Sequence, residues 1–427
     1  MKSCKPASPG RWQPAVLAGN LRSKRIDPQS NLMPPRDFGR SLFRPVISTI
    51  RSASPHADQC KMNDLPVTND YRRLFLEDTP LLDVRAPVEF ERGAFPLAEN
   101  RPLIDDEERH RIGIRYKEMG QDAAIELGAE LVSEEIRKTR IHEWEHFFAK
   151  HPEGVLYCFR GGMRSKITQQ WLKERTGKSF PRVEGGYKAL RRFLIDELDA
   201  AACEINTVVI GGRTGVGKTL LLRHLPNSVD LEGLAHHRGS AFGHYAIPQP
   251  SQIDFENALS IALLKHRARG NRPLIIEDEG QNIGSVHLPL DLFNRFKSGD
   301  FVILEASIEE RVDITWKEYV EDALKDFQQV HGEEHAFPAW NDYVMRGFSR
   351  IRKRLGGLRH AELANEIDAA MRHHRETGET QQHKAWIRTL LVDYYDPMYD
   401  YQLGRKRKKI VFSGDADAVS DYLQSHD

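Results

Sequence analysis

The sequence predicts an α/β fold with two successive parallel-sheet units and a mainly helical C-terminal region. Twice, an apolar run passes into a glycine-rich loop and then into a helical pattern, first around residue 160 and again around residue 215. Strand, loop and helix in this order are typical of a parallel α/β unit. The last hundred or so residues read as mainly helical. We therefore predict sheet domains at 62–200 and 201–330 and a helical region at 331–427, after a basic extension at 1–61.

The composition favours a soluble protein of two or three domains. The chain has 427 residues, of which 40% are hydrophobic, and its 62 basic and 62 acidic residues balance. A balanced charge excludes a wholly basic nucleic-acid coat but permits local basic patches. No apolar run reaches the roughly 18 residues needed to cross a bilayer. Four cysteines without C-x-x-C or zinc spacing favour a reducing cytoplasm and one reactive thiol over a disulfide framework.

The first 61 residues differ from the rest of the chain. They contain eleven Lys or Arg, three Asp and no Glu, with many Pro and Ser and little periodicity. Such a segment buries too little apolar surface to fold alone, so disorder is expected. Two other interpretations stay open: an organelle transit peptide, which the prolines disfavour, and a translation start at Met62.

The first unit is expected to begin near Tyr71 and to end near Leu194. Apolar runs bounded by charge or glycine predict its strands, and apolar residues three to four positions apart predict its helices. In chain order we expect a strand at 80–85, a short helix and turn at 89–94, an extended segment at 98–103, a helical stretch at 107–148, and a strand, glycine turn and helix at 182–190.

The loop at 158–164, Cys-Phe-Arg-Gly-Gly-Met-Arg, is the first candidate site. It follows the apolar run at 154–157 and precedes a helical pattern. Its glycines let successive N–H groups curl around one point, which with the helix N-terminus, Arg160 and Arg164 favours an anion. This setting predicts that the pKa of the Cys158 thiol falls below its usual value of about 8.5, so that a thiolate nucleophile forms. A buried, inert cysteine is the alternative.

The loop at 212–219, Gly-Arg-Thr-Gly-Val-Gly-Lys-Thr, is the second candidate site. It fits G-x-x-x-x-G-K-[ST] and lies between a β-branched run at 207–210 and three leucines at 220–222. In this context the loop N–H groups cradle a di- or triphosphate, Lys218 reaches its terminal oxygens and Thr219 holds Mg²⁺. The glycines that allow this turn are Gly212, Gly215 and Gly217. Whether the ligand is a nucleotide or another pyrophosphate stays open.

Acidic and polar residues farther along predict the rest of this site. Glu277 and Asp278 end an apolar strand at 273–279 and are the candidates for holding Mg²⁺, with a solvated acidic turn equally expected. Another core strand is expected at 301–306. The glycine- and histidine-rich segment 230–243, which contains Arg238, is predicted to form a substrate loop near the phosphates. Its adjacent histidines lack a third ligand, so no metal site is firm.

Two basic clusters in the C-terminal region are candidates for binding RNA. One lies at 346–354 and the other at 405–409, just after the tyrosine-rich segment 394–401. Basic residues beside aromatic ones suit an RNA backbone and an unstacked base. A solvated charge run beside a core tyrosine cluster is the alternative. The candidate tRNA-binding residues are Arg350, Arg354, Arg405, Lys406 and Arg407.

The first unit resembles a rhodanese (sulfurtransferase) domain. The resemblance rests on Asp-Val-Arg at 83–85, the cysteine loop at 158–164 and Val-Glu-Gly-Gly-Tyr at 183–187. It departs from the pattern at 94–96, Ala-Phe-Pro, where many rhodaneses have a histidine after the glycine; that histidine is not catalytic, so the expected fold stands. The five residues between cysteine and arginine also match the C-x5-R loop of cysteine phosphatases. Tyr157, not histidine, directly precedes the cysteine.

The two loops in this order resemble those of the bacterial tRNA 2-selenouridine synthases. The match continues through blocks at 230–243, 277–279 and 394–399 and spans about 70–412. Either loop alone occurs in many families, but the ordered pair with these blocks is highly specific. The resemblance implies a transferase of selenium-containing groups that replaces sulfur by selenium at C2 of the wobble 2-thiouridine, position 34, of tRNA.

The resemblance also implies the substrates and partners. Geranyl diphosphate first alkylates the sulfur, and selenophosphate then supplies the selenium that replaces the geranylthio group. Cys158 is implied to carry selenium as S-selanylcysteine, and we hypothesise that the phosphate loop binds geranyl diphosphate rather than ATP. The implied partners are the tRNA anticodon loop and the synthase that makes selenophosphate; a monomer without membrane contact is expected, and Mg²⁺ is the one candidate cofactor. A rhodanese-related cysteine phosphatase and an ATP-dependent RNA-binding module stay open as alternatives.

Overall fold

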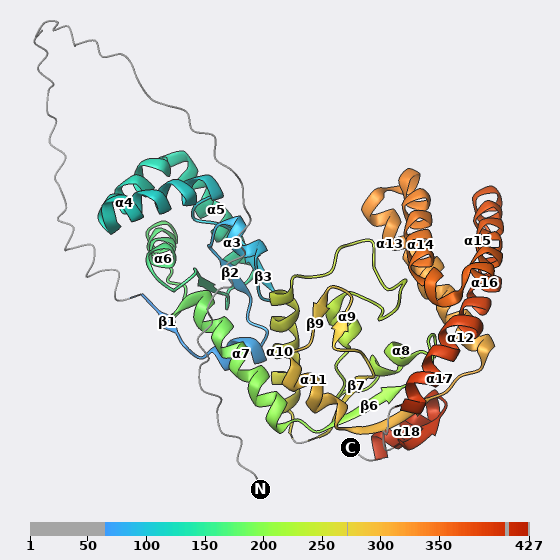
Figure 1. Ribbon diagram of the computed structural model, residues 1–427. Helices are drawn as coiled ribbons and strands as arrows, with labels where there is room; N and C mark the ends of the chain where they lie inside the picture. The colour runs from blue at the N-terminus through green and yellow to red at the C-terminus, as the bar shows by residue number, and fades with distance from the viewer. Residues whose placement is uncertain (1–64, 271, 406–409, 426–427) are drawn as a thin grey trace, which may run out of the picture. The chain divides into compact units, whose positions relative to one another are not determined.

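The computed structural model describes residues 65–270, 272–405 and 410–425. The basic extension at 1–61 lies outside these residues. Within them, a five-stranded and a four-stranded parallel sheet follow one another along the chain, and a helical region comes between the last two strands of the second sheet (Figure 1). The predicted class, α/β with parallel sheets and a helical C-terminal region, is confirmed.

The first sheet has the strand order β1-β5-β4-β2-β3, and every recorded pair in it is parallel. Its strands are β1 (Val67–Thr68), β2 (Leu81–Asp83), β3 (Ala98–Asn100), β4 (Val155–Tyr157) and β5 (Arg182–Val183). The helices are α2 (Tyr71–Leu76), α3 (Pro87–Glu91), α4 (Asp106–Leu131), α5 (Glu134–Lys150), α6 (Met163–Thr176) and α7 (Gly186–Glu204). Each element predicted for this stretch is present, but α7 runs to Glu204, beyond the expected end of the unit near Leu194.

Both faces of the first sheet are buried, as a parallel sheet requires. Neighbouring residues of one strand point to opposite faces. Leu81 and Tyr157 accordingly pack with α2 and α7, whereas Leu82 and Leu156 pack with α5 and α6. The apolar runs that predict these strands therefore reflect burial on two sides.

The second sheet has the order β11-β10-β6-β7, again with all pairs parallel. Its strands are β6 (Thr207–Gly211), β7 (Leu274–Glu277), β10 (Asp300–Leu304) and β11 (Ile410–Gly414). Around it lie α8 (Lys218–Leu222), α9 (Leu231–Ala235), α10 (Gln252–Ala268), α11 (Leu290–Lys297), α18 (Ala416–Ser425) and the hairpin of β8 (Asn282–Ile283) and β9 (Val286–His287). The strands expected at 273–279 and 301–306 are present as β7 and β10.

Strand β11 is a correction to the region predicted as mainly helical. It pairs with β10 at the edge of the second sheet, and α18 packs behind it through Val419 and Leu423. Only three residues of its run, 410–412, are apolar, and they directly follow a basic cluster. A run this short shows neither the hydrophobic period of a helix nor that of a strand, so pairing with β10 decides its conformation.

The helical region precedes β11 and has a core of its own. It comprises α12 (Ile308–Trp316), η1 (Lys317–Asp322), α13 (Ala323–His331), α14 (Glu333–Leu355), α15 (Gly357–Thr377), α16 (His383–Leu390), η2 (Leu391–Tyr395) and α17 (Asp396–Arg405). The fully buried residues Trp340, Leu363 and Ile387 lie in one cluster. η1 and η2 are π-helical turns, which occur frequently at functional sites. None of the helices in the described part of the chain is both long and apolar enough to span a bilayer.

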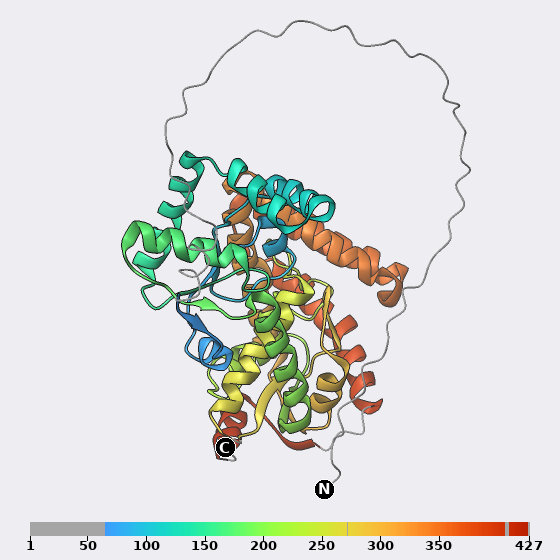
Figure 2. The ribbon, with the colours of Figure 1, turned by 90° about the vertical axis from the view of Figure 1, so that its left-hand side faces the viewer.

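Helix α10 packs against both sheet-containing parts of the chain (Figure 2). Its Ile261 and Leu264 complete one core of the first sheet. Two of its side chains bind the backbone of Ala94. Ala94 N donates to Asp254 at 2.6 Å, and the fully buried Asn257 donates to Ala94 O at 2.6 Å. The Ala-Phe-Pro segment, where the chain departs from the rhodanese pattern, is therefore a docking point for α10.

His383 is expected to make the stability of the helical region depend on pH. It is fully buried; its Nδ1 accepts from Trp386 Nε1 at 2.9 Å and its Nε2 lies 3.1 Å from His374 Nδ1. Burial first, and then His374, lowers the pKa of His383 to about 3. The unfolded chain takes up this proton near pH 6.5 and the folded protein does not. The contribution of His383 to the free energy of unfolding should therefore be largest above pH 6.5 and fall by roughly 2 kcal/mol between pH 6.5 and 5.

Denaturant unfolding followed by tryptophan fluorescence measures this slope. His383→Asn should be less stable than the wild type at pH 7.5, and this difference should shrink by roughly 2 kcal/mol as the pH falls from 6.5 to 5. The control His142→Asn, an exposed position on α5, should follow the wild type at each pH. A difference between wild type and His383→Asn that stays constant from pH 7.5 to 5 would contradict the expectation.

Candidate active site

Both candidate loops begin where a parallel strand ends. Cys158 follows β4, and Gly212 follows β6. Ligands of open α/β sheets bind at the carboxyl ends of the strands, where loops rather than helices line the sheet edge. The two loops are therefore placed where such a fold binds its ligands.

The cysteine loop is held in shape by backbone contacts with the start of α7. Tyr187 N donates to Cys158 O at 2.9 Å, and Lys188 N donates to Phe159 O at 3.1 Å. Gly161 and Gly186 have φ values of +62° and +59°, a region that favours glycine. A Cβ on Gly186 would lie 2.2 Å from Cys158 O. The loop and the glycine turn predicted at 185–186 therefore form one interlocked unit.

Cys158 itself is buried beneath its loop. The residue is 3% exposed and packs with Leu156 and Leu172. Its Sγ lies 3.3 Å from the hydroxyl of Ser165, which in turn donates to Gly162 O at 3.0 Å. The sulfur thus faces the first turn of α6, and a reagent must enter the loop to reach it.

The two arginines of the loop have different surroundings. Arg160 is exposed. Arg164 forms a bidentate ion pair with Glu89 of α3, with two hydrogen bonds of 2.5 and 3.1 Å. Burial alone would lower the pKa of Arg164, but Glu89, with a smaller contribution from Cys158, raises it. Arg164 therefore contributes positive charge near the sulfur while Glu89 occupies its donors.

Glu89 is a site residue that the sequence analysis misses. Besides Arg164 it accepts from Ala86 N at 3.2 Å and lies 3.3 Å from Arg109 Nε. Burial would raise the pKa of Glu89, but Arg164 and these other partners lower it below its ordinary value. Its helix is predicted, but nothing local signals a partner 75 residues away.

Replacing Gly186 by alanine is expected to disrupt the cysteine loop. The new Cβ would collide with Cys158 O and Gly161 N in a backbone conformation that alanine rarely adopts. We expect a loss of roughly 2–5 kcal/mol in the free energy of unfolding, measured by denaturant titration. Gly162→Ala is the matched control, because a Cβ there would meet no atom within 4 Å and the φ of Gly162 is −92°. Equal stability of the two variants would show that the loop is not interlocked with α7.

The phosphate loop also depends on left-handed glycines. Gly215 and Gly217 have φ values of +78° and +86°, and a Cβ on Gly215 would lie 2.4 Å from Thr315 Oγ1 of α12. A Cβ on Gly212 would lie 2.6 Å from Leu304 O at the end of β10. Lys218 and Thr219 then begin α8. The structure brings all five predicted phosphate-binding residues together on one short segment.

A cavity of about 360 Å³ opens beside this loop. Its polar lining includes Lys218, Thr219, Glu232, Arg238, Asp278 and Glu279. Its apolar and aromatic lining includes Val216, Ile314, Tyr319, Tyr395, Met398 and Tyr399. The π-helical turns η1 and η2 contribute Tyr319 and Tyr395. One cavity therefore combines phosphate-binding groups with an apolar wall, and its lining lies wholly within residues 214–402, without the cysteine loop.

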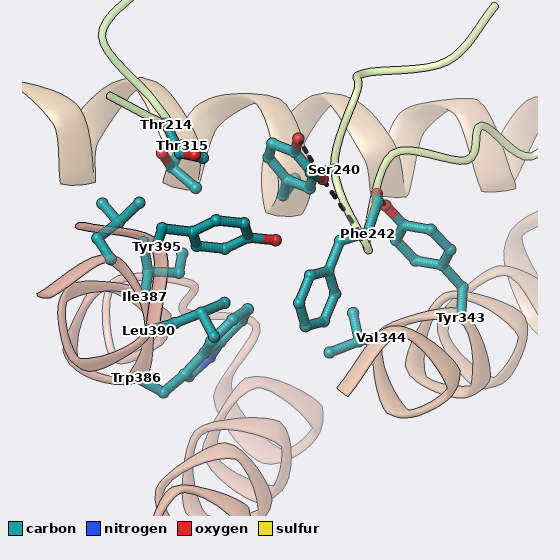
Figure 3. A pocket seen from close by; sticks show the side chains of 12 residues that line it. Thr214, Ser240, Phe242, Thr315, Tyr343, Val344, Trp386, Ile387, Leu390 and Tyr395 are labelled. Atoms are coloured by element: carbon teal, nitrogen blue, oxygen red, sulfur yellow. Dashed lines mark hydrogen bonds between the residues drawn. The ribbon is translucent and has the colours of Figure 1, made fainter. Parts of the chain in front are cut away.

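A smaller hollow of about 20 Å³ lies behind the same wall. Figure 3 shows Thr214 and Thr315 on one side of it and Trp386, Ile387 and Leu390 on the other, with the Tyr395 hydroxyl pointing inward. The hydroxyls of Thr315 and Tyr395 have no partner among the described residues. A hollow of this size holds about one water molecule, so it extends the apolar wall without offering room for a larger ligand.

Three glutamates lie next to the phosphate loop, of which Glu277 is buried and Glu232 and Glu279 are partly buried. Thr219 Oγ1 donates to Glu232 Oε2 at 3.1 Å, and Glu277 Oε1 accepts from Glu232 N at 2.8 Å. Burial first, and then the charge of Glu279, raises the pKa of Glu232 to about 8. Burial also raises the pKa of Glu277 and Glu279. At neutral pH Glu232 holds a proton, so it does not repel an anionic ligand as a carboxylate would.

The two predicted Mg²⁺ candidates have other partners. Glu277 binds the backbone at the start of α9, and Asp278 Oδ1 lies 2.6 Å from Lys297 Nζ. No three His, Cys, Asp or Glu side chains in the described ranges are arranged to hold a metal ion by themselves. Mg²⁺ at this loop remains a prediction, for which Thr219 offers a hydroxyl oxygen.

Arg238 is the second cation of the cavity. Its side chain is 10% exposed, and its guanidinium lies 3.8 Å from the ring centre of Tyr245 and 5.2 Å from that of Tyr319. Asp326 is 3.8 Å away, and Nη1 has no hydrogen-bond partner in the described part of the chain. A buried guanidinium that lines a cavity can donate to an anionic ligand. The prediction that Arg238 belongs to a loop near the phosphates agrees with this position.

Helix α17 is tied to the phosphate loop by ion pairs that the sequence analysis misses. Arg213 donates to Asp400 at 2.9 Å. Arg311 donates to Asp396 at 3.0 and 2.6 Å and to Thr214 O at 3.0 Å. The block at 394–399 is recognisable in the sequence, but the partners of Asp396 within it and of Asp400 just after it are known only from the fold. These pairs position Met398 and Tyr399 over the loop.

The predicted RNA-binding residues are only partly described. Arg350 and Arg354 are exposed on α14. Arg350 Nη1 lies 3.5 Å from Ala241 O, and Arg354 Nη1 lies 3.6 Å from Met398 Sδ. Of Arg405 only the backbone is described, and Lys406 and Arg407 lie outside the described residues.

Known proteins resemble this chain over nearly all of its described length. The family model described as "tRNA 2-selenouridine synthase AAA domain" matches residues 205–427. Proteins named tRNA 2-selenouridine synthase are 51% identical over 364 residues in Marinobacter nauticus, 50% over 357 in Bordetella petrii and 51% over 358 in Alcanivorax borkumensis. These alignments cover 84–85% of this chain and 96–99% of the relatives. They are much longer than the family-model match, so the likeness includes the cysteine-loop unit.

Proposed function

The chain belongs to the tRNA 2-selenouridine synthase family, and from this premise we propose that it replaces sulfur by selenium at C2 of the wobble 2-thiouridine of tRNA. It is then a tRNA-modifying transferase with the anticodon loop as its macromolecular substrate. In this proposal the reaction proceeds in two steps, one for each candidate loop.

The first proposed step is alkylation of the 2-thiouridine sulfur by geranyl diphosphate. The sulfur attacks C1 of the geranyl group, the C1–O bond breaks, and pyrophosphate leaves. Lys218, Thr219 and the loop N–H groups bind the diphosphate and stabilise the charge that grows on it. Alkylation converts the sulfur into a better leaving group.

The observation that carries this step is the mixed lining of the 360 Å³ cavity. Lys218 and Arg238 supply charge for a diphosphate, and Ile314, Met398 and Tyr399 supply an apolar wall for a hydrocarbon chain. The raised pKa of Glu232 keeps that carboxyl neutral near the phosphates at pH 7. A nucleoside triphosphate would use the same loop but would not need the apolar wall.

The second proposed step is displacement at C2 by a selenium nucleophile. The C2–Se bond forms, the C2–S bond breaks, and geranylthiolate leaves. Selenophosphate is the proposed selenium source, and Cys158 the proposed carrier as S-selanylcysteine. Forming the S–Se bond from selenide-level selenium is a two-electron oxidation, for which the proposal takes a small disulfide as oxidant, and phosphate leaves as the Se–P bond is hydrolysed. After the selenium attacks C2, a small thiol reduces the S–Se bond, which frees the selenouridine and restores the Cys158 thiol. The rhodanese-like segments of the first unit support this role, because a cysteine in such a loop handles sulfur or selenium at the end of a parallel strand. The lining of the P-loop cavity excludes the cysteine loop, so the uridine must move between the two loops.

Mass spectrometry of nucleosides tests the proposal. The protein is incubated with 2-thiouridine tRNA and geranyl diphosphate, with and without selenophosphate. We expect geranylated wobble uridine without selenophosphate and 2-selenouridine with it. Unchanged tRNA, together with hydrolysis of an aryl phosphate or tRNA-stimulated hydrolysis of ATP, would favour the phosphatase or the ATP-dependent module instead.

Competition with a non-hydrolysable ATP analogue tests the ligand of the phosphate loop. If geranyl diphosphate occupies this loop, a saturating analogue that binds there should slow geranylation. An undiminished rate, with analogue binding confirmed by calorimetry, would assign the two ligands to separate sites.

A further inference from the structure

A second cavity, of about 380 Å³, lies between the segment 241–248 and helices α13 and α14. Its size falls within the range of about 300–1,000 Å³ that is typical of small-ligand sites. Aromatic side chains form much of its wall, among them Tyr245, His244, Phe327 and His331. The rings of Phe327 and His331 are stacked, with centroids 5.7 Å apart. The cavity therefore offers flat faces against which a planar ring can pack.

Two arginines at this cavity have no acidic partner among the described residues. Arg346 and Arg350 are exposed, line the cavity and stand four residues apart on α14, where like charges oppose each other. Their recorded hydrogen bonds go to backbone oxygens, those of Asp342 and Ala241. Burial first, and then Arg350 and Arg346, lower the pKa of His244, which also lines the cavity. A bound anion would relieve the repulsion between them.

One side-chain stack separates this cavity from the phosphate-loop cavity. Arg238 packs on Tyr245 at 3.8 Å and on Tyr319 at 5.2 Å. Tyr245 lines the second cavity, whereas Arg238 and Tyr319 line the first. A ligand in the second cavity is thus the immediate neighbour of one at the phosphate loop, but the stack prevents a single ring from occupying both.

We propose that this second cavity binds the unstacked base of a nucleotide that flanks the modified uridine, with Arg346 and Arg350 on the RNA backbone. Aromatic faces beside exposed arginines are the chemistry of single-stranded nucleic-acid sites. Asp342, also in the lining, is an acceptor for a base amino group. The inference rests on the proposed function, since it takes RNA to be the substrate.

Fluorescence anisotropy with a labelled anticodon stem-loop tests the site without any chemistry. Arg346→Ala and Arg350→Ala should each weaken binding roughly tenfold at low salt and lower the slope of log Kd against log salt by about 0.7. Arg352→Ala is the matched control, an exposed arginine on the same helix that does not line the cavity. This variant should lose less binding affinity, and its slope of log Kd against log salt should stay closer to that of the wild type.

A second arm tests the base. Two stem-loops are compared, each lacking the base of one of the two nucleotides that flank the uridine. One of the two should bind the wild type roughly tenfold more weakly than the intact stem-loop does. His331→Ala should reduce this difference, because it removes part of the stacking face. Equal effects of Arg350→Ala and Arg352→Ala would overturn the inference, and so would no loss with either abasic stem-loop. Uridine monophosphate binding as tightly as the stem-loop would also overturn it, in favour of a mononucleotide site.

The two failures are distinguishable. If the wild type modifies tRNA but the cavity variants bind it like the control, the proposed function stands and the cavity has another role. If the wild type binds the stem-loop as described but modifies nothing, the RNA site stands and the selenium chemistry fails.

Discussion

Replacing Cys158 by serine is expected to abolish incorporation of selenium into tRNA while geranylation and tRNA binding persist. A hydroxyl group is not ionised at neutral pH and cannot carry selenium as the thiolate does. The variant should therefore accumulate geranylated wobble uridine when it receives both substrates. Nucleoside mass spectrometry measures both products, and anisotropy measures binding. The substitution exchanges one small buried side chain for another, so the fold should persist.

Cys203→Ser is the matched control, because Cys203 is the other cysteine among the described residues and is exposed on α7. It should behave like the wild type in each assay. Selenium incorporation by Cys158→Ser at the wild-type rate would show that the Cys158 sulfur takes no part in the reaction. Loss of both products would instead indicate that the substitution disturbs more than the selenium step.

Replacing Lys218 by alanine is expected to reduce geranylation by roughly 100-fold or more, because a positive charge that stabilises a leaving diphosphate is lost. The recorded contact of Lys218 Nζ is a long one, 3.5 Å to Gly212 O, so the loop does not depend on it for its shape. Selenium incorporation into 2-thiouridine tRNA should fall with it. Pre-geranylated tRNA should restore selenium incorporation, since Cys158 is intact.

Lys317→Ala is the matched control, an exposed lysine of η1 that does not line the cavity. It should geranylate at the wild-type rate. With pre-geranylated tRNA, Lys218→Ala should be active and Cys158→Ser inactive, a contrast that assigns one step to each loop. Failure of Lys218→Ala on pre-geranylated tRNA would show that the phosphate loop also serves the selenium step.

The predicted elements and the observed ones agree best where the signal is local. The apolar runs before residues 158 and 212 are strands because both faces of each sheet are buried, which favours continuous apolar sequence. The glycines of the two loops are readable because only glycine adopts the positive φ values found at 161, 186, 215 and 217 without strain. β11 and the π-helical turns have no such local signal.

The partners of the site residues could not be predicted in the same way. Glu89 binds Arg164 across 75 residues, and Asp396 binds Arg311 across 85. From the sequence alone, each of these two carboxylates would be interpreted as an ordinary charge on the surface of a helix. The apolar wall of the phosphate cavity and the aromatic wall of the second cavity are likewise assembled from segments far apart in the chain.

By itself, the sequence determined the α/β class, the family and the two chemically distinct loops, because backbone conformation and family motifs are encoded in contiguous residues. Tertiary structure alone decided that Cys158 is buried under its loop, that Arg164 faces Glu89, and that a phosphate loop shares a cavity with an apolar wall. The physical reason is that burial, pairing of charges and cavity shape depend on which distant segments pack together, and no local pattern records that.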